Sequence, residues 1–180
     1  MVRLHFNGCI ALLAALATTP ALAWEPADLV GTVYYRRCVD CNDWVGLPAD
    51  VSDTYGTMIS SSSSEPQSFG VQGFRRADGA TFMSFDLMSN FEDGRAYNRV
   101  LGVLDTTGTQ VMYCSVNGPE IVAVLTPEEH SWIQKQPVNA AEGQLATLRN
   151  PQKVYRMNTR TLQIEPIDGR GVSCVGFPRG

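Results

Sequence analysis

Hydrophobic and polar residues alternate with a period of two in several stretches of the chain, which is the pattern of half-buried β-strands. The clearest stretches are 69–75 and 81–88, which flank the pair Asp78-Gly79. An Asp-Gly pair between two apolar runs is a strong signal for a β-hairpin. The alternation in the second stretch predicts two opposite faces, with Met83, Phe85 and Leu87 on one and Ser84 and Asp86 on the other.

Similar patterns predict the remaining strands, at 29–37, 54–59, 99–105, 109–116, 120–125, 154–157, 161–167 and 171–177. Turn residues between them predict two more hairpins, which pair 99–105 with 109–116 and 154–157 with 161–167. The strand at 120–125 is apolar on both faces, which favours a central place in a sheet. Clusters of Gly, Pro, Asn, Asp and Ser predict loops at 42–53 and 60–66.

One helix has clear start and stop signals. Thr126 is a good N-cap, Pro127 suits the first helical position, and Glu129 completes a capping box. The helix should run from Pro127 to about Gln136, because a proline follows directly. A weaker pattern at 140–148 predicts a second helix, although Gly143 disfavours it.

These elements together predict a mainly β fold. We expect an antiparallel barrel or sandwich of about eight short strands with one or two short helices, stabilised by disulfides. The chain contains no internal repeat, and its motifs do not resemble those of a known family.

The N-terminus has the features of a signal peptide. Arg3 precedes a short apolar run, and Ala21-Leu22-Ala23 supplies the small-x-small pattern of a cleavage site. The run is shorter than the about 20 residues that span a bilayer. Cys9 precedes most of the run, which argues against a lipid anchor at that residue. We therefore expect a cleaved signal at 1–23, a single β-rich domain at 24–180, and export to a periplasm or secretion.

The composition narrows the class of partner. The net charge of −4 argues against a general nucleic-acid binder, which would carry a basic patch. No apolar run after the signal is long enough to cross a membrane. A protein or a cell-envelope component is the expected partner, and the sequence does not indicate an oligomeric state.

Four cysteines remain after the predicted signal, and an even number in an exported chain favours two disulfides. These are Cys38, Cys41, Cys114 and Cys174. The sequence leaves three pairings open. We favour a local bridge within the Cys-x-x-Cys motif and a long one between the other two cysteines. In the chain-entropy model these bridges contribute roughly 2 and roughly 4 kcal/mol.

The Cys-x-x-Cys motif also has chemical interpretations. A thiol-redox site would place its first cysteine at a helix N-terminus, but Gly46 and Pro48 would stop such a helix. Arg36 and Arg37 could lower a thiol pKa, so this alternative stays open. A zinc site would favour a second close pair of ligands, which is missing. Haem attachment needs a histidine where Asn42 stands.

Catalytic chemistry has little support. His130 is the only histidine after the predicted signal, and no Gly-x-Ser-x-Gly motif is present. We therefore expect no catalytic residue, no metal and no cofactor, and the sequence favours a protein that is not an enzyme.

A candidate binding surface surrounds the cysteine motif, in Tyr34, Tyr35, Arg36, Arg37 and Trp44. Tyr, Trp and Arg dominate interface hot spots. The alternative is that Tyr34 or Tyr35 turns into the core and Trp44 covers it. The resulting hypothesis is an exported, non-catalytic, disulfide-stabilised domain that binds a protein or cell-envelope component. The second hypothesis is an exported thiol-redox protein or enzyme that uses Cys38 and Cys41.

Overall fold

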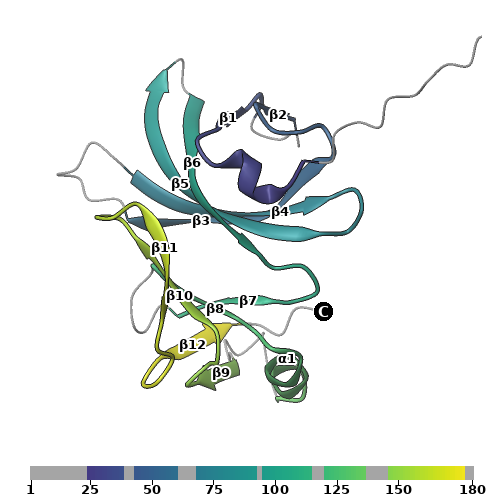
Figure 1. Cartoon of the computed structure of the whole chain (residues 1–180), viewed down its shortest axis with the longest axis vertical. Helices are drawn as coiled ribbons and strands as arrows, with labels where there is room; N and C mark the ends of the chain where they lie inside the picture. The colour runs from purple at the N-terminus through teal and green to yellow at the C-terminus, as the bar shows by residue number, and fades with distance from the viewer. Residues whose placement is uncertain are drawn as a thin grey trace, which may run out of the picture.

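The computed structural model describes residues 24–38, 43–60, 68–92, 95–114, 120–136 and 146–176, and most of these residues lie in β-strands. The strands form a six-stranded sheet, a four-stranded sheet and a two-stranded ribbon. Figure 1 shows the six-stranded sheet curled at one end of the molecule, with the smaller sheet, the ribbon and helix α1 at the other. The predicted mainly β, antiparallel fold is confirmed, and the larger sheet is a half-barrel.

The half-barrel has the strand order β2-β1-β6-β5-β4-β3, with every neighbouring pair antiparallel. Its strands are β1 (Val33–Arg36), β2 (Trp44–Val45), β3 (Val51–Ser60), β4 (Ser68–Arg76), β5 (Thr81–Glu92) and β6 (Arg95–Asp105). The predicted hairpin at Asp78-Gly79 joins β4 to β5. Gly79 has a φ of 91°, a conformation that glycine adopts without a steric penalty.

The four-stranded sheet has the order β11-β10-β8-β7. Its strands are β7 (Val111–Tyr113), β8 (Ile121–Val124), β10 (Val154–Asn158) and β11 (Gln163–Ile167). All residues of β8 are buried, and this strand is central, as the two-sided apolar run predicts. The predicted hairpin of β10 with β11 is also confirmed. The ribbon pairs β9 (Ala146–Arg149) with β12 (Ser173–Gly176).

The alternation along β5 decides which side chains join which core. Met83 and Phe85 pack with Val122 of β8 and Met157 of β10 in the core between the two sheets. The opposite face of β5 points into the half-barrel, where Ser84 donates a hydrogen bond to Asp86. The two faces predicted from the sequence are confirmed.

Helix α1 (Pro127–Gln134) begins where the capping box predicts. The Thr126 hydroxyl accepts a hydrogen bond from the Glu129 N–H at 3.3 Å, and the Glu129 carboxylate accepts one from the Thr126 N–H at 2.8 Å. The same carboxylate accepts a hydrogen bond from the Gln152 N–H, which attaches the start of the helix to the approach of β10. Within the described ranges, no helix combines the length and apolar character needed to cross a membrane.

The second predicted hairpin is wrong. Strand β6 pairs with β5 and β1, whereas β7 pairs with β8, so the chain passes from the half-barrel to the four-stranded sheet between Asp105 and Val111. The predicted first strand at 29–37 is also too long, because Leu29 ends a 3-10 helix, η1 (Pro26–Leu29), and β1 begins only at Val33. The predicted loop at 42–53 contains β2 and the start of β3.

The second predicted helix is wrong where the structure describes it. Residues 137–145 lie outside the described residues, and Ala146–Arg149 form strand β9. Ala146 and Leu148 are buried whereas Thr147 and Arg149 are exposed. This period of two matches a strand, and pairing with β12 overrides the helical preference of the segment.

A disulfide joins Cys114, directly after β7, to Cys174 of β12. Both cysteines are fully buried, in a core that includes Ala146 and Leu148. This bridge is the long-range half of the favoured pairing, and it fastens the ribbon to the four-stranded sheet. Cys38 is also disulfide-bonded. Cys41, its expected partner, lies outside the described residues, as do the predicted signal at 1–23 and most of the serine-rich loop.

Candidate binding cup of the half-barrel

The interior of the half-barrel contains a cavity of about 710 Å³. We call it the cup, and each strand of the half-barrel contributes to its lining. Representative residues, in strand order, are Arg36, Trp44, Asp53, Gln72, Asp86 and Asn98. The exposed residues Arg37 and Met58 also line it and therefore mark its mouth.

Aromatic side chains fill the rest of the half-barrel interior. Tyr34, Phe74 and Phe82 are each 1% exposed and lie in one core with Leu29 and Val100. The rings of Tyr34 and Phe74 meet edge to face at 5.8 Å, and those of Phe74 and Phe82 lie 5.2 Å apart. Edge-to-face and offset arrangements of this kind are favourable for aromatic pairs. Of these three aromatic residues, Tyr34 also lines the cup.

Asp86 is the only buried carboxylate among the described residues. The Tyr34 hydroxyl and the Ser84 hydroxyl each donate a hydrogen bond to Asp86 Oδ2 at 2.8 Å. Asp86 Oδ1 is also buried and has no hydrogen-bond partner among the described residues. Asp86 lies in the lining of the cup, so this carboxylate borders the space that a ligand would occupy.

Burial is the main cause of the raised pKa values of Asp86 and Tyr34. Loss of solvent raises the pKa of Asp86 to about 7, although the hydrogen bonds from Tyr34 and Ser84 counteract the rise. Burial also raises the pKa of the Tyr34 hydroxyl, and the neighbouring Asp86 raises it further. Tyr34 therefore remains a neutral donor near pH 7, whereas Asp86 changes its charge near that pH.

The register of the strands explains why the cup extends to Asp86. Gly70 of β4 lies directly opposite Asp86, so no side chain from that position covers the carboxylate. Gln72 of β4 lies opposite Gly56 of β3, and a Cβ on Gly56 would come within 2.2 Å of the Gln72 side-chain oxygen. Two glycines thus provide space for the cup and for the Gln72 side chain. A β-bulge between Phe85 and Asp86 shifts the pairing of β5 with β6 at the same level.

Side chains connect the two edges of the half-barrel beside the cup. Arg36 of β1 forms an ion pair with Asp53 of β3, and its guanidinium lies 4.7 Å from the centre of the Trp44 ring. The Trp44 indole N–H donates a hydrogen bond of 3.4 Å to Asp53. Because β2 and β3 are the edge strands, these contacts hold the curled sheet in its cupped shape.

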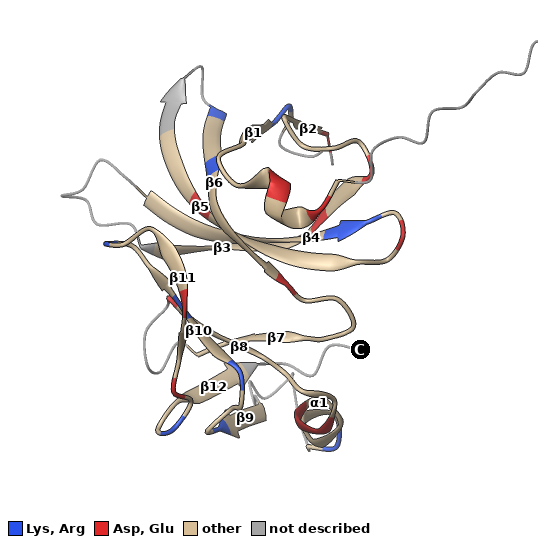
Figure 2. Ribbon diagram, viewed as in Figure 1, with Lys and Arg blue, Asp and Glu red and all other residues tan. Residues whose placement is uncertain are grey.

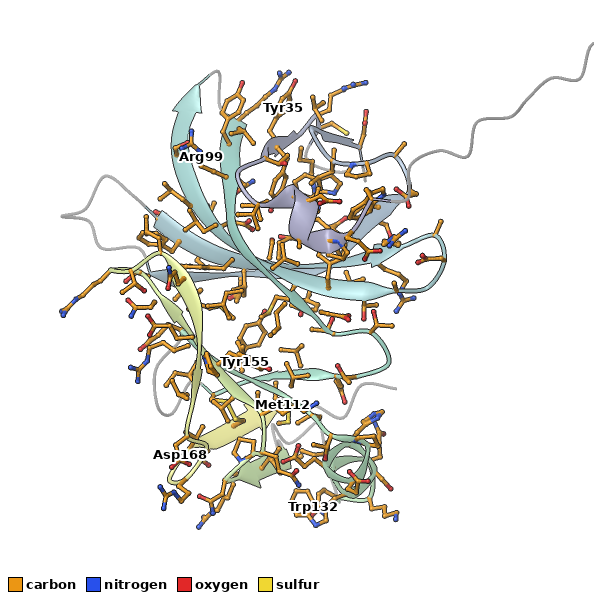
Figure 3. All side chains as sticks on the ribbon, in the orientation of Figure 1. Tyr35, Arg99, Met112, Trp132, Tyr155 and Asp168 are labelled. Carbon is orange, nitrogen blue, oxygen red and sulfur yellow. A yellow bond between two sulfur atoms is a disulfide. The ribbon has the colours of Figure 1, made fainter. Side chains whose placement is uncertain are left out.

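The structure divides the five residues of the sequence-predicted surface between two faces. Tyr34, Arg36, Arg37 and Trp44 line the cup. Tyr35 points the other way, against Tyr97, with ring centres 5.1 Å apart. Figure 3 shows Tyr35 at the end of the half-barrel far from the four-stranded sheet. Tyr34 is a core residue and Trp44 packs against its ring at 5.3 Å, which is the arrangement that the alternative described.

Of the four predicted disulfide cysteines, Cys38 is exposed and lines the cup, whereas Cys114 and Cys174 are buried in the other half of the molecule. Sequence reasoning missed Asp86 and Asp53 as members of the site. The alternation along β5 contained a signal for Asp86, because it placed Ser84 and Asp86 together opposite the apolar face.

A second cavity of about 680 Å³ lies between the two sheets, and His130 lines it. The Tyr55 and Tyr113 hydroxyls are buried there without hydrogen-bond partners among the described residues, and burial raises the pKa of Tyr55 to about 12. His130 Nε2 lies 3.2 Å from the Gln134 side-chain nitrogen. In the described part of the chain, no cluster of His, Cys, Asp and Glu side chains could hold a metal ion.

Figure 2 shows that Lys and Arg, like Asp and Glu, are spread over the ribbon of both sheets. No family model, curated protein or solved structure matches this chain. The chemistry of the cup is therefore the basis for a functional hypothesis.

Proposed function

We propose that this protein is an exported, non-catalytic binding domain whose cup receives part of a protein or of a cell-envelope component. The observation that carries the proposal is the cup itself, with a buried carboxylate at its base. Its volume of about 710 Å³ lies within the 300–1,000 Å³ range of typical ligand sites. Its lining combines the aromatic rings of Tyr34 and Trp44 with polar side chains such as Asp86, and such a mixture is typical of ligand sites.

The construction of the half-barrel supports binding by a preformed site. Tyr34, Phe74 and Phe82 are packed in the core, and Asp53 of the edge strand β3 bonds both to Trp44 of the opposite edge strand β2 and to Arg36 of β1. A preformed site loses little conformational entropy when it binds, so more of the interaction energy appears as affinity. The buried disulfide and the predicted signal at 1–23 support the proposal of export.

The test is to block the cup and measure capture. Ala96 lies in the lining of the cup, and Ala96→Trp would fill part of it. Thr147→Trp, at an exposed position of β9, is the matched control for a new surface tryptophan. We expect an envelope fraction of the producing organism to yield a component that wild type and Thr147→Trp retain and Ala96→Trp loses. Equal retention by all three folded proteins would contradict binding in the cup.

A specific observation also supports thiol-redox chemistry as a second candidate. Cys38 is disulfide-bonded, exposed and close to Arg36 and Arg37 in the lining of the cup. The reduction potential of the Cys38 disulfide distinguishes the two candidates. Structural disulfides lie below about −300 mV, and catalytic ones lie higher. A value near −200 mV, with turnover of a disulfide substrate that Cys38→Ser abolishes, would favour the redox function.

A further inference from the structure

The base of the cup contains a negative charge without a cationic partner. None of the ion pairs among the described residues includes Asp86. A buried carboxylate without a nearby cation is costly, and that cost is the reason why burial raises its pKa. The two hydroxyl donors both reach Oδ2, so Oδ1 retains its full capacity to accept a hydrogen bond.

Two of the three arginines that line the cup have carboxylate partners. Arg36 pairs with Asp53, and Arg37 pairs with Asp43 at 3.1 Å. The guanidinium of Arg95 lies over the Tyr35 ring, 5.6 Å from its centre, and Tyr35 belongs to the face outside the cup. The two ion pairs offset the positive charges of Arg36 and Arg37, so Arg95 is the one arginine of the lining without a carboxylate partner among the described residues.

Resting on the binding function proposed above, we propose that the cup receives a positively charged nitrogen group with N–H donors, an alkylammonium or a guanidinium, and that Asp86 is its counter-ion. The N–H group would supply the hydrogen bond that Oδ1 lacks and the charge that the carboxylate lacks.

An anionic group fits the base of the cup less well. It would have to approach a carboxylate, and no described cation lies within ion-pair distance of that carboxylate. Such a ligand would require Asp86 to be protonated. The two ligand classes therefore depend on pH in opposite directions. A cation binds the ionised carboxylate and binds more tightly as pH rises through about 7, whereas an anion binds more tightly as pH falls.

Few other charged groups face Asp86. Strand β1 contributes Tyr34 and Arg36, and β3 contributes Asp53, which is paired with Arg36. The neighbouring strand β4 presents Gly70 and Gln72, and β6 presents Asn98 and Val100, none of which carries a charge. Strand β6 also contributes the exposed Arg95 to the lining of the cup. Tyr34 does not ionise near neutral pH because its pKa is raised. The pH dependence of binding between pH 5.5 and 8 should therefore report on Asp86.

The experiment is an NMR titration of the ¹⁵N-labelled protein with n-butylammonium chloride, and with sodium butyrate as the anionic counterpart. We expect butylammonium to shift resonances of the cup at pH 8 and to bind about 30-fold more weakly at pH 5.5, as a pKa of about 7 requires. Asp86→Asn should abolish this binding. Asp78→Asn, which removes one charge in the exposed β4–β5 turn, should leave it unchanged.

Two peptides separate the sources of the cation. Acetyl-Gly-Lys-Gly-amide tests a partner side chain, with acetyl-Gly-Gln-Gly-amide as the neutral control. Binding of the lysine peptide with loss in Asp86→Asn supports a side chain of a partner protein, and binding of butylammonium alone supports a small amine. No binding of either amine, or preferential binding of butyrate that strengthens at low pH, would overturn the proposal.

The capture experiment distinguishes this proposal from the more general one. If Asp86→Asn retains the captured component as wild type does while Ala96→Trp loses it, the cup binds its partner but the cationic ligand is wrong. If Ala96→Trp also retains the component, the binding function itself is wrong.

Discussion

Asp86→Asn should make the protein more stable at pH 8 and remove most of the pH dependence of its stability between pH 5 and pH 8. The folded carboxyl has a pKa of about 7, whereas the unfolded carboxyl has a value near 3.8. Between these values the native state holds a proton that the unfolded state has lost. The stabilising contribution is therefore complete below about pH 4, declines as pH rises, and is lost above about pH 7.

The magnitude follows from the two pKa values. At 1.36 kcal/mol per pH unit, the wild type should lose about 4 kcal/mol across the whole window and about 3 kcal/mol between pH 5 and pH 8. The asparagine amide can still accept the hydrogen bonds of Tyr34 and Ser84 through its oxygen. Its NH2 group would replace Oδ1 and lack a described partner, which costs about 1–3 kcal/mol. The expected net gain at pH 8 is about 1–3 kcal/mol.

The assay is urea unfolding at pH 5, 6, 7 and 8 with the disulfides intact, with Asp78→Asn as the control for a lost surface charge. Glu165 and Asp168 have lowered pKa values because of hydrogen bonds from Asn158 and Arg170, so their contributions are lost only as pH falls below this window. The free energy of unfolding of the wild type should fall with pH while that of Asp86→Asn stays nearly level. Parallel curves for the two proteins would refute the assignment of a raised pKa to Asp86.

Three further predictions concern other parts of the molecule. Replacing both Cys114 and Cys174 with alanine should lower the free energy of unfolding by about 4 kcal/mol in the chain-entropy model, which urea unfolding would measure; a loss below 1 kcal/mol would contradict this. Tyr34→Phe should raise the pKa of Asp86 above its wild-type value, because a hydrogen bond to the charged form is lost, and a ¹³C NMR titration of the carboxyl carbon checks the direction. Thr126→Ala should cost about 1 kcal/mol because helix α1 loses its N-cap, whereas Thr126→Ser should cost much less in the same unfolding assay.

The elements that the sequence predicts correctly are those whose signals lie within a few consecutive residues. The Asp78-Gly79 turn joins β4 to β5, and the capping box at Thr126 begins helix α1, because both signals act within a few residues. The segment at 140–148 shows the limit of local signals. Its helical pattern gives way at Ala146–Arg149 to pairing with β12, a strand far along the chain.

The site could be predicted only in part for a similar reason. The aromatic and arginine residues around the cysteine motif drew attention to Arg36 and Trp44, which line the cup. Their role in joining the sheet edges depends on Asp53, and no local pattern connects β1 to β3. The curl of the sheet brings these residues together.

The sequence by itself determined the β character of the chain, the two faces of β5, the capped helix and the set of cysteines available for disulfides. These properties follow from the periodicity of burial and from turn and capping chemistry, which act over short distances. Only the tertiary structure decided that the polar face of β5 would be enclosed rather than exposed. Asp86 is 2% exposed because the half-barrel curls around it and Tyr34, 52 residues earlier in the chain, donates a hydrogen bond to it. The pKa of a carboxylate depends on the groups that surround it in space, and residues distant in sequence supply those groups.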